Sequence, residues 1–184
     1  MKRIAIFLSI ILAITLNQTI CIAQNTRTFS KDNFSFKYPS KYQVESEDIS
    51  NFGIRMTMVN VSSLDDDYLA EYAVTYTSNP IQYLYKDHEQ IMMLKTRATD
   101  ALDGFKESEG ITNTKHTGPF ETTFKNKRAA KITFSSQILI YTVYGEIISF
   151  FDKGHLVVIM KMTDNKSNLS SGDFLFIDNS ITFK

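Results

Sequence analysis

Apolar and β-branched side chains dominate the segment from Lys127 to Thr163, which reads KRAAKITFSSQILIYTVYGEIISFFDKGHLVVIMKMT. Such residues fit a pleated, half-buried surface, so the segment predicts two or three adjacent antiparallel strands. Asp152, Lys153 and Gly154 separate two apolar runs and predict a tight hairpin turn, since glycine supplies the positive φ that such turns demand. A second turn is expected between Ser135 and Thr142, where neither Gly nor Pro marks its position.

Side chains of the stretch from Tyr141 to Phe151 are apolar on both faces of the predicted strand. Val143 and Ile147 point to one face, while Tyr144 and Ile148 point to the other. A sheet with one solvated face would alternate apolar and polar residues, so a strand that is apolar on both faces needs cover on both. The pattern therefore predicts a central sheet between two packing layers.

The hydrophobic period changes after Pro80 and becomes that of an amphipathic helix, which Gly104 is expected to end. Its predicted apolar stripe consists of Leu84, Tyr85, His88, Ile91, Met92, Ala98 and Leu102. A helix from Ile81 to Leu102 would cover one face of the sheet. A short helix around Phe174 and Ile177 is the candidate cover for the other face.

Shorter extended segments complete the expected sheet: residues 28–30, 34–38, 42–45, 52–61, 68–77 and 120–124. Gly118 and Pro119 are expected to form a loop or bulge, Lys125 with Asn126 a turn, and residues 181–183 either a last strand or a packed tail. The expected fold class is α+β. It is a three-layer α/β/α sandwich with a central antiparallel sheet, one long helix on one face and a short C-terminal helix on the other.

The N-terminus has the pattern of a secretory signal peptide. Two basic residues precede an uncharged run from Ile4 to Leu16, which is too short to span a bilayer, and Ala23 lies at an expected cleavage site. Lipoprotein processing at Cys21 is disfavoured, because Ile20 stands where that enzyme requires a small residue. We therefore expect residues 1–23 to be a cleaved signal for Sec export, and residues 24–184 to be one periplasmic or secreted domain.

Charge and cysteine content narrow the classes of function. The whole chain has 20 basic and 20 acidic residues, and removal of the signal takes two basic ones away and leaves a net charge of −2. Nothing in that balance attracts nucleic acid or an anionic membrane. Cys21 is the only cysteine, so the expected mature chain has no disulfide and no cysteine nucleophile.

Catalytic motifs are missing from the sequence, which has no GxSxG, no glycine-rich phosphate loop and no HExxH. His88 is expected to be a hydrogen-bonded histidine in or beside the core, whereas His116 and His155 are expected to be exposed. A zinc site built from these three is geometrically allowed but has no supporting motif. No catalytic, cofactor-binding or metal-binding residue is predicted.

Two charged clusters each allow two interpretations. The aspartates at 65–67 are read as a solvated corner rather than a calcium site, because three adjacent carboxylates cannot all face one ion. Four basic residues lie beside a predicted turn: Lys125, Lys127, Arg128 and Lys131. We expect them to deter edge pairing rather than to bind anions.

Aromatic residues are the candidates for contacts with a partner. Tyr68, Tyr72 and Tyr76 either form an exposed platform or, as the intervening Ala and Val favour, lie buried under a helix. Tyr83 and Met93 lie off the predicted helical stripe and are the candidate partner-binding residues.

Two motifs lie in a familiar order. FSFKYPSKY at Phe34 to Tyr42 is an aromatic strand followed by Tyr-Pro and a further aromatic residue, and the strand HLVVIMKM precedes a short helix and Ser-Ile-x-Phe at Ser180 to Phe183. Across residues 28–184 this order resembles the PsbP-like, or Mog-type, domain superfamily, and it suggests a secreted bacterial member.

The resemblance implies a three-layer sandwich around an antiparallel sheet. It also implies mostly non-catalytic roles, since the superfamily includes an extrinsic subunit of photosystem II, a Ran-binding nuclear protein and periplasmic or chaperone-like bacterial proteins. No functional residue carries over, because the matching motifs are structural.

A well-specified fold without catalytic motifs favours a secreted or periplasmic, non-enzymatic binding or accessory domain. Its expected partner is an unknown protein or envelope component, with no cofactor, no nucleic acid and no membrane span. The alternative is a carrier of a small apolar ligand, held between the sheet and an incomplete second helical layer.

Overall fold

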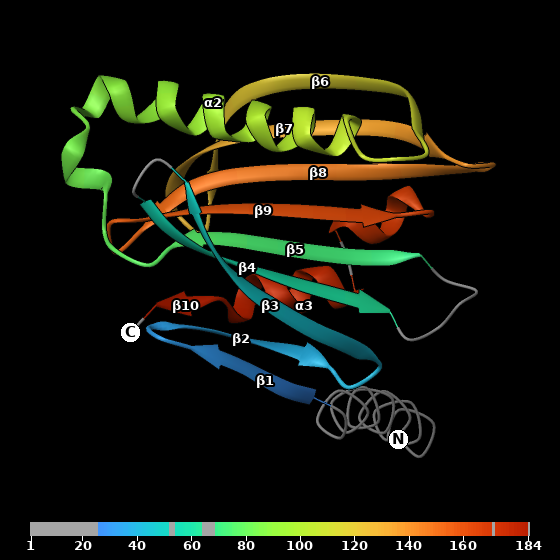
Figure 1. The fold of residues 1–184 in the computed structure, drawn as a ribbon, viewed down its shortest axis with the longest axis horizontal. Coiled ribbons are helices and arrows are strands. Elements are labelled where there is room, and N and C mark those ends of the chain that lie inside the picture. The colour runs from blue at the N-terminus through green and yellow to red at the C-terminus, as the bar shows by residue number, and fades with distance from the viewer. Residues whose placement is uncertain (1–25, 52–53, 64–68, 171, 184) are drawn as a thin grey trace, which may run out of the picture.

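The computed structural model describes residues 26–51, 54–63, 69–170 and 172–183. The predicted signal peptide, residue Tyr68 and the aspartates at 65–67 lie outside the described residues. The described strands form two antiparallel sheets (Figure 1). The larger has the order β3-β4-β5-β9-β8-β7-β6, with β3 at Tyr42–Asn51, β4 at Ile54–Ser63, β5 at Ala70–Thr77, β6 at Ile111–Phe124, β7 at Lys127–Ile138, β8 at Tyr141–Asp152 and β9 at His155–Thr163.

The smaller sheet joins the two ends of the described chain. It has the order β1-β2-β10, with β1 at Thr26–Lys31, β2 at Phe34–Pro39 and β10 at Thr182–Phe183. The residues at 181–183 therefore end in a strand, which pairs with the N-terminal hairpin and not with the larger sheet. The α-helices are α2 at Asp87–Lys106 and α3 at Gly172–Ser180, and the 3-10 helices are η1 at Gln82–Leu84 and η2 at Lys166–Ser170. These elements confirm the α+β class.

Both predicted hairpin turns of the central strands are present. Lys153 and Gly154 connect β8 to β9 with φ angles of 48° and 84°. The Gly154 carbonyl accepts hydrogen bonds from the backbone N–H groups of Ile81 and Gln82, at 2.8 and 3.0 Å, so this turn is fixed by the segment before α2. The unmarked turn lies at Leu139 and Ile140, between β7 and β8.

Helix α2 lies over strands β6 to β9 (Figure 1). Its buried residues, Ile91, Leu94, Ala98, Leu102 and Phe105, pack against apolar side chains of β7, β8 and β9. The hydroxyl of Ser149 in β8 donates to the Leu94 carbonyl at 2.6 Å. The predicted long cover for one face is therefore present.

The predicted bounds of this helix are wrong at both ends. It begins at Asp87, where the Glu89 carboxylate accepts a hydrogen bond from the Lys86 backbone N–H at 2.8 Å and so caps the first turn. It continues past Gly104, because Phe105 packs its ring against Phe134 with centroids 4.9 Å apart and holds the last turn on the sheet.

The opposite face of the larger sheet has a mixed cover. The short helix α3 shares it with η2 and with the smaller sheet, whose Phe34 stacks on Tyr76 of β5 at 4.3 Å. Tyr72, also in β5, packs against Phe174 of α3 at 5.9 Å. Tyr72 and Tyr76 are thus buried, but only Tyr72 lies against a helix. The short helix is thus a cover for this face, as predicted, but an incomplete one, and the small sheet supplies a large part of the apolar surface.

Gly118 and Pro119 lie within β6, where the register against β7 shifts between Thr117 and Phe120, as a bulge would cause. Lys125 and Asn126 form the expected turn, with φ angles of 50° and 62°. Among the described residues, no helix has the length and apolar character that crossing a bilayer requires.

Candidate functional site

The hairpin between β7 and β8 ends in three consecutive exposed apolar side chains. Leu139, Ile140 and Tyr141, which we call the hairpin tip, are 79%, 86% and 62% exposed. Figure 1 shows this tip at one end of the larger sheet. The Leu139 backbone N–H donates to the Gly110 carbonyl at 3.4 Å, which places the loop after α2 beside the tip. Single exposed apolar residues are ordinary, but three in a row at a turn form a patch.

The backbone conformation of the tip is also unfavourable for the residues that form it. Leu139 has φ 56°, in the left-handed region that Gly, Asn and Asp adopt far more readily. A leucine there costs on the order of 1 kcal/mol, and a two-residue hairpin turn with positive φ at its first central residue only could be made from Gly-Asn without that cost. Neither folding nor solubility therefore accounts for Leu-Ile at this turn, which makes it a candidate contact site.

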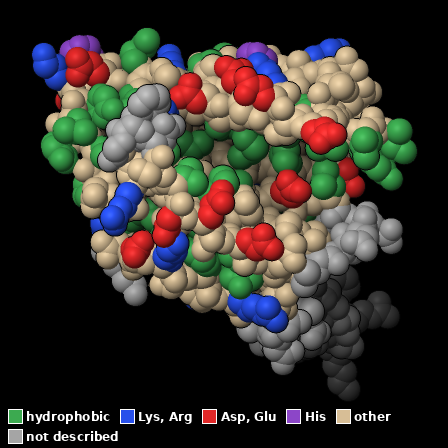
Figure 2. All heavy atoms as spheres, in the orientation of Figure 1, with side chains coloured by type: hydrophobic (Ala, Val, Ile, Leu, Met, Phe, Trp, Pro, Cys, Tyr) green, Lys and Arg blue, Asp and Glu red, His purple; other side chains and the backbone are tan. Residues whose placement is uncertain are grey.

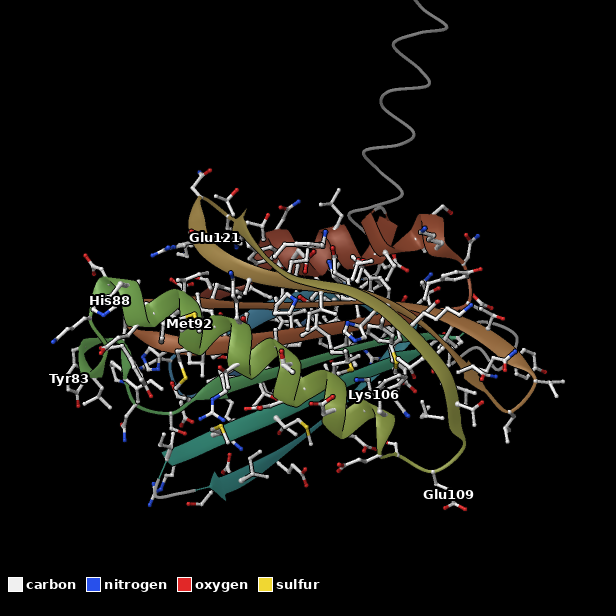
Figure 3. All side chains as sticks on the ribbon, turned by 90° about the horizontal axis from the view of Figure 1, so that it is seen from above. Tyr83, His88, Met92, Lys106, Glu109 and Glu121 are labelled. Carbon is white, nitrogen blue, oxygen red and sulfur yellow. The ribbon has the colours of Figure 1, made fainter. Side chains whose placement is uncertain are left out.

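The predicted partner-binding residues lie at the other end of the molecule, near the start of α2. Tyr83 is 79% exposed, as expected, but Met93 is partly buried against Ile91, Leu94 and their cluster. Met92 is instead 63% exposed, and Figure 3 shows it on the same part of α2 as His88. A role for either predicted residue in partner binding stays a prediction.

The exposures of Met92 and Met93 are the reverse of those predicted, and the reversal has a simple cause. The predicted stripe took its phase from Leu84 and Tyr85, which lie before the helix begins. The helix that forms has its buried face through Ile91, Leu94, Ala98, Leu102 and Phe105, and this shifts the stripe away from Met92.

The histidines also differ from expectation. His88 is exposed in the first turn of α2 rather than in or beside the core, because the buried stripe begins one turn later. His155 is buried rather than exposed: its Nδ1 lies 2.7 Å from the Thr77 carbonyl oxygen, and its ring stacks on Phe183 at 4.7 Å. His116 is exposed, as predicted. Over the part of the chain that the structure describes, no three potential metal-ligating side chains gather.

The four clustered basic residues are individually paired. Lys127 Nζ lies 2.8 Å from Asp152 Oδ1, and Arg128 Nε lies 2.5 Å from Glu121 Oε1. Lys125 donates to the backbone carbonyls of Asn179 and Ile181, and Lys131 pairs with Glu146. They therefore bind neighbouring parts of the fold and do not form one open patch.

Lys131 is the first member of a buried chain of charges that we call the ion chain. Glu146 of β8 pairs with Lys131 and, through Oε2, with Lys161 Nζ of β9 at 2.7 Å. Lys161 Nζ also lies 2.9 Å from Asp178 Oδ2 of α3, and Asp178 Oδ1 accepts a hydrogen bond from the Tyr72 hydroxyl at 2.7 Å. With Tyr72 of β5, the chain connects five elements of the fold across the α3 face.

The contacts of the ion chain shift the pKa values of Lys161, Glu146 and Tyr72. Burial alone lowers the pKa of Lys161, but the charges of Asp178 and Glu146 outweigh burial and raise it above the ordinary value. Burial likewise raises the pKa of Glu146, but Lys161 and Lys131 lower it overall. Burial and the Asp178 charge hold the pKa of Tyr72 well above its usual range. Lys161 is therefore no nucleophile, and Glu146 is no general acid, at neutral pH.

The exposed end of the ion chain opens into a cleft of about 480 Å³. Strands β6, β7 and β8 form its floor and η2 one wall, so it lies on the part of the α3 face that α3 leaves uncovered. Its polar lining includes Lys115, Thr117, Lys131, Thr133, Tyr144 and Lys166. We call this the lysine cleft.

A second hollow lies below α2 on the face shown in Figure 2, with hydrophobic side chains visible in it. Helix α2 lies over β6 to β9, which leaves β3 to β5 less covered on that side. Met58, Thr75 and Val158 are cross-strand neighbours there, and all three are half-buried. On this part of the sheet, apolar side chains are therefore partly exposed, because α2 does not cover them.

Neither the ion chain nor the tip was predicted from the sequence, although the sequence contains a feature that points to each. Glu146 and Lys161 are single charges inside strands that read as covered on both faces, and a buried charge requires a partner. The tip had a weaker signal, since Leu139 and Ile140 lie in a segment that must turn without Gly or Pro. Nothing local in the sequence marks Asp178 as the partner of Lys161.

Comparison with known proteins gives a fold but no family. No protein-family model matches the sequence, and no curated protein matches it. Among solved structures, the chain is similar to cyanobacterial PsbP (CyanoP) from Synechocystis sp. PCC 6803, with a TM-score of 0.53 and 10% identity. The match covers 87% of this chain and 93% of that one. The described fold is thus similar to that of PsbP, as the sequence motifs predicted.

Proposed function

We propose that this chain is an exported, non-enzymatic binding domain that recognises a protein of the cell envelope through its hairpin tip. The proposal treats residues 1–23 as a cleaved Sec signal and residues 24–184 as a single periplasmic or secreted domain of the PsbP-like, Mog-type kind. It takes the three-layer α/β/α arrangement as the frame that holds the tip in place.

The observation that carries the proposal is the exposure of Leu139, Ile140 and Tyr141 at a turn that does not need them. Burying two such aliphatic side chains in a partner is worth about 3–6 kcal/mol before ordering costs. Glu107 and Glu109 lie in the exposed loop that contacts the tip. Their charges disfavour an anionic lipid surface and favour an apolar protein pocket with basic residues at its rim.

The non-enzymatic part of the proposal has support in the ion chain. Glu146 and Lys161 are the buried ionisable side chains nearest the lysine cleft, and they hold each other in their charged forms. A general acid or base requires a pKa near the working pH, and the shifts of Glu146 and Lys161 run away from it. The likeness to PsbP, which is to a fold only, is compatible with an accessory role.

The test replaces the tip by residues that suit the turn. The variant Leu139→Gly with Ile140→Asn should fold at least as stably as the wild type, because glycine suits the positive φ at position 139 and Gly-Asn favours a turn in which only the first central residue has positive φ. Its matched control is Leu175→Asn, which removes an exposed leucine from α3. Each mature protein is immobilised and exposed to envelope extract, and each captured protein is then measured for affinity.

A partner that binds the wild type and Leu175→Asn, but binds the tip variant at least tenfold more weakly, supports the proposal. Equal binding by the tip variant, or equal weakening by the control, contradicts it. Sustained turnover by the purified mature chain on ester, glycoside or peptide substrates would contradict the non-enzymatic part.

The alternative function, a carrier of a small apolar ligand, is favoured by one observation: the hollow below α2, in which hydrophobic side chains are visible (Figure 2). The expected location, opposite α2, is lined by lysines and hydroxyl groups and does not suit an apolar ligand. Mass spectrometry of the purified chain under native and denaturing conditions separates the two functions. A co-purified lipid favours the carrier, and its absence favours the protein-binding domain.

A further inference from the structure

We propose that the lysine cleft binds a ligand that carries a phosphate group. The site is separate from the proposed docking function, because Leu139, Ile140 and Tyr141 do not line it. Three elements each bring one lysine to it: β6 provides Lys115, the adjacent strand β7 provides Lys131, and η2, distant in sequence, provides Lys166. A cleft of about 480 Å³ is within the size range of small-molecule sites.

The charge of the cleft is opposite to that of the chain. Three lysines against the single carboxylate of Glu146 leave an excess of two positive charges in its lining. An excess of one remains when Asp164 is counted, which lies with Lys166 and Tyr144 in the adjoining depression. The sequence after the expected signal is net negative, so this cleft is a local positive region that concentrates anions.

Two of the three cleft lysines have no ion-pair partner among the described residues, and an ion pair holds the third at the cleft. Within the described part of the chain, Lys115 and Lys166 form no ion pair with any side chain. Lys131 pairs with Glu146, but Glu146 also pairs with the buried Lys161, so its charge is shared between two ammonium groups. The ion chain thus fixes Lys131 at the cleft and neutralises Glu146, the carboxylate in the cleft lining that would repel an anion.

Hydroxyl groups complete the lining. The Oγ1 atoms of Thr117 and Thr133 are hydrogen-bonded to each other at 2.7 Å on the cleft floor, so one of the two protons remains available to a ligand. Tyr144 is half-buried at the side of the cleft next to Lys166. Phosphate oxygens accept hydrogen bonds from both ammonium and hydroxyl groups.

Phosphate fits this set of donors better than a carboxylate does. Carboxylates are recognised best by the planar fork of arginine, and the cleft contains no arginine. Three separate point charges around a pair of hydroxyls suit a tetrahedral, doubly charged group. An apolar ligand would leave the lysines desolvated and unpaired.

The test titrates the mature chain with glycerol phosphate while amide signals are followed by NMR. Signals of Thr117, Thr133 and Tyr144 should shift and saturate. The double variant Lys115→Gln with Lys166→Gln should bind about tenfold more weakly, which corresponds to the loss of about 1.4 kcal/mol. The matched control Lys37→Gln, an exposed lysine in β2 of the smaller sheet, should bind like the wild type.

Two further arms identify the source of the phosphate. Vesicles containing phosphatidic acid that bind the wild type but not the double variant would assign a lipid head group, and binding of glycerol phosphate without vesicle binding would assign a soluble ligand. Both results support the proposal. It is overturned if no saturable binding occurs, if glucuronate binds as tightly as glycerol phosphate, or if Lys37→Gln weakens binding as much as the double variant. None of these results depends on the hairpin tip.

Discussion

The two faces of the larger sheet are built by the same strands but bury different chemistry. Towards α2, β8 contributes Gly145 and Ile147, and β9 contributes Met162, to an apolar layer. Towards α3, the neighbouring residues Glu146 and Lys161 carry buried charges. Because side chains alternate along a strand, one residue separates a hydrocarbon environment from an ionic one.

This difference shows what each cover does. Helix α2 is continuous over β6 to β9, so the face beneath it can close by packing alone. On the other side α3 has only nine residues and shares the cover with the small sheet. The ion chain joins α3 to β8 and β9 where apolar contact is limited, and it ends in the lysine cleft where the cover stops. Such a chain constrains geometry more than it stabilises the fold.

The strongest test of the ionic face is removal of its central charge. Lys161→Met should lower the free energy of unfolding by about 3–5 kcal/mol, because it leaves Asp178 buried without a counterion and Glu146 paired with Lys131 only. Urea denaturation of the mature chain gives the measurement. Lys131→Met is the control and should lose roughly 1 kcal/mol or less, since its side chain is 37% exposed against 3% for Lys161. Equal losses would show that burial does not separate the two lysines.

On the apolar face, the space between packed side chains limits which substitutions are tolerated. Gly145 faces the ring of Phe134 so closely that an added methyl group would overlap it. Gly145→Ala should therefore cost about 1–3 kcal/mol in urea denaturation, as overpacking of a core does. The double variant with Phe134→Leu should lose less than the two single losses combined, because the smaller side chain relieves the overlap. Additive losses would mean that Gly145 is required for another reason.

Acidification should act on the ionic face rather than the apolar one, and more weakly than either substitution, since every group stays in place. The pKa of Glu146 is lowered in the folded chain, so its stabilising contribution is present above the ordinary pKa of glutamate, about 4.3, and is lost as the pH falls through the folded value. Lys161 has a raised pKa, so its contribution is present below about 10.4 and is lost as the pH rises through the folded value.

Urea denaturation between pH 3 and pH 7 measures the acid limb. Glu146→Gln should flatten the fall in stability on acidification, whereas the exposed control Glu109→Gln should leave the slope as in the wild type. An unchanged slope in Glu146→Gln would mean that other carboxylates control the acid limb.

The same contrast separates what the sequence predicts from what it does not. Apolar residues on both faces of β8 correctly predict that both faces are covered, because alternation is a local property of the strand. The identity of the second cover was predicted only in part. It depends on β10 pairing with β2, between segments at opposite ends of the described chain, and no local pattern encodes that pairing.

The candidate sites follow the same division. Exposure of Tyr83 was predicted correctly because it lies outside any apolar period, whereas Met92 and Met93 were exchanged because the helix begins later than its pattern. The lysine cleft could not be predicted. Lys131 stands out in the sequence only as part of a basic cluster that was not expected to bind anions, and Lys115 and Lys166 are ordinary surface lysines. Only the register of β6 with β7 and the position of η2 bring the three together.

Ile132 and Thr133 give the smallest test of the two faces, because they are consecutive in β7 and point to opposite sides. Ile132 is fully buried in the apolar cluster beneath α2, so Ile132→Val should cost about 0.5–1.5 kcal/mol. Thr133 is exposed on the cleft floor, and Thr133→Val should change the unfolding free energy by no more than about 0.5 kcal/mol while weakening glycerol phosphate binding. Urea denaturation and NMR titration of both variants measure the two effects. Stability that fell more in Thr133→Val than in Ile132→Val would mean that the cleft floor is part of the core, and the distinction between the faces would then not hold at β7.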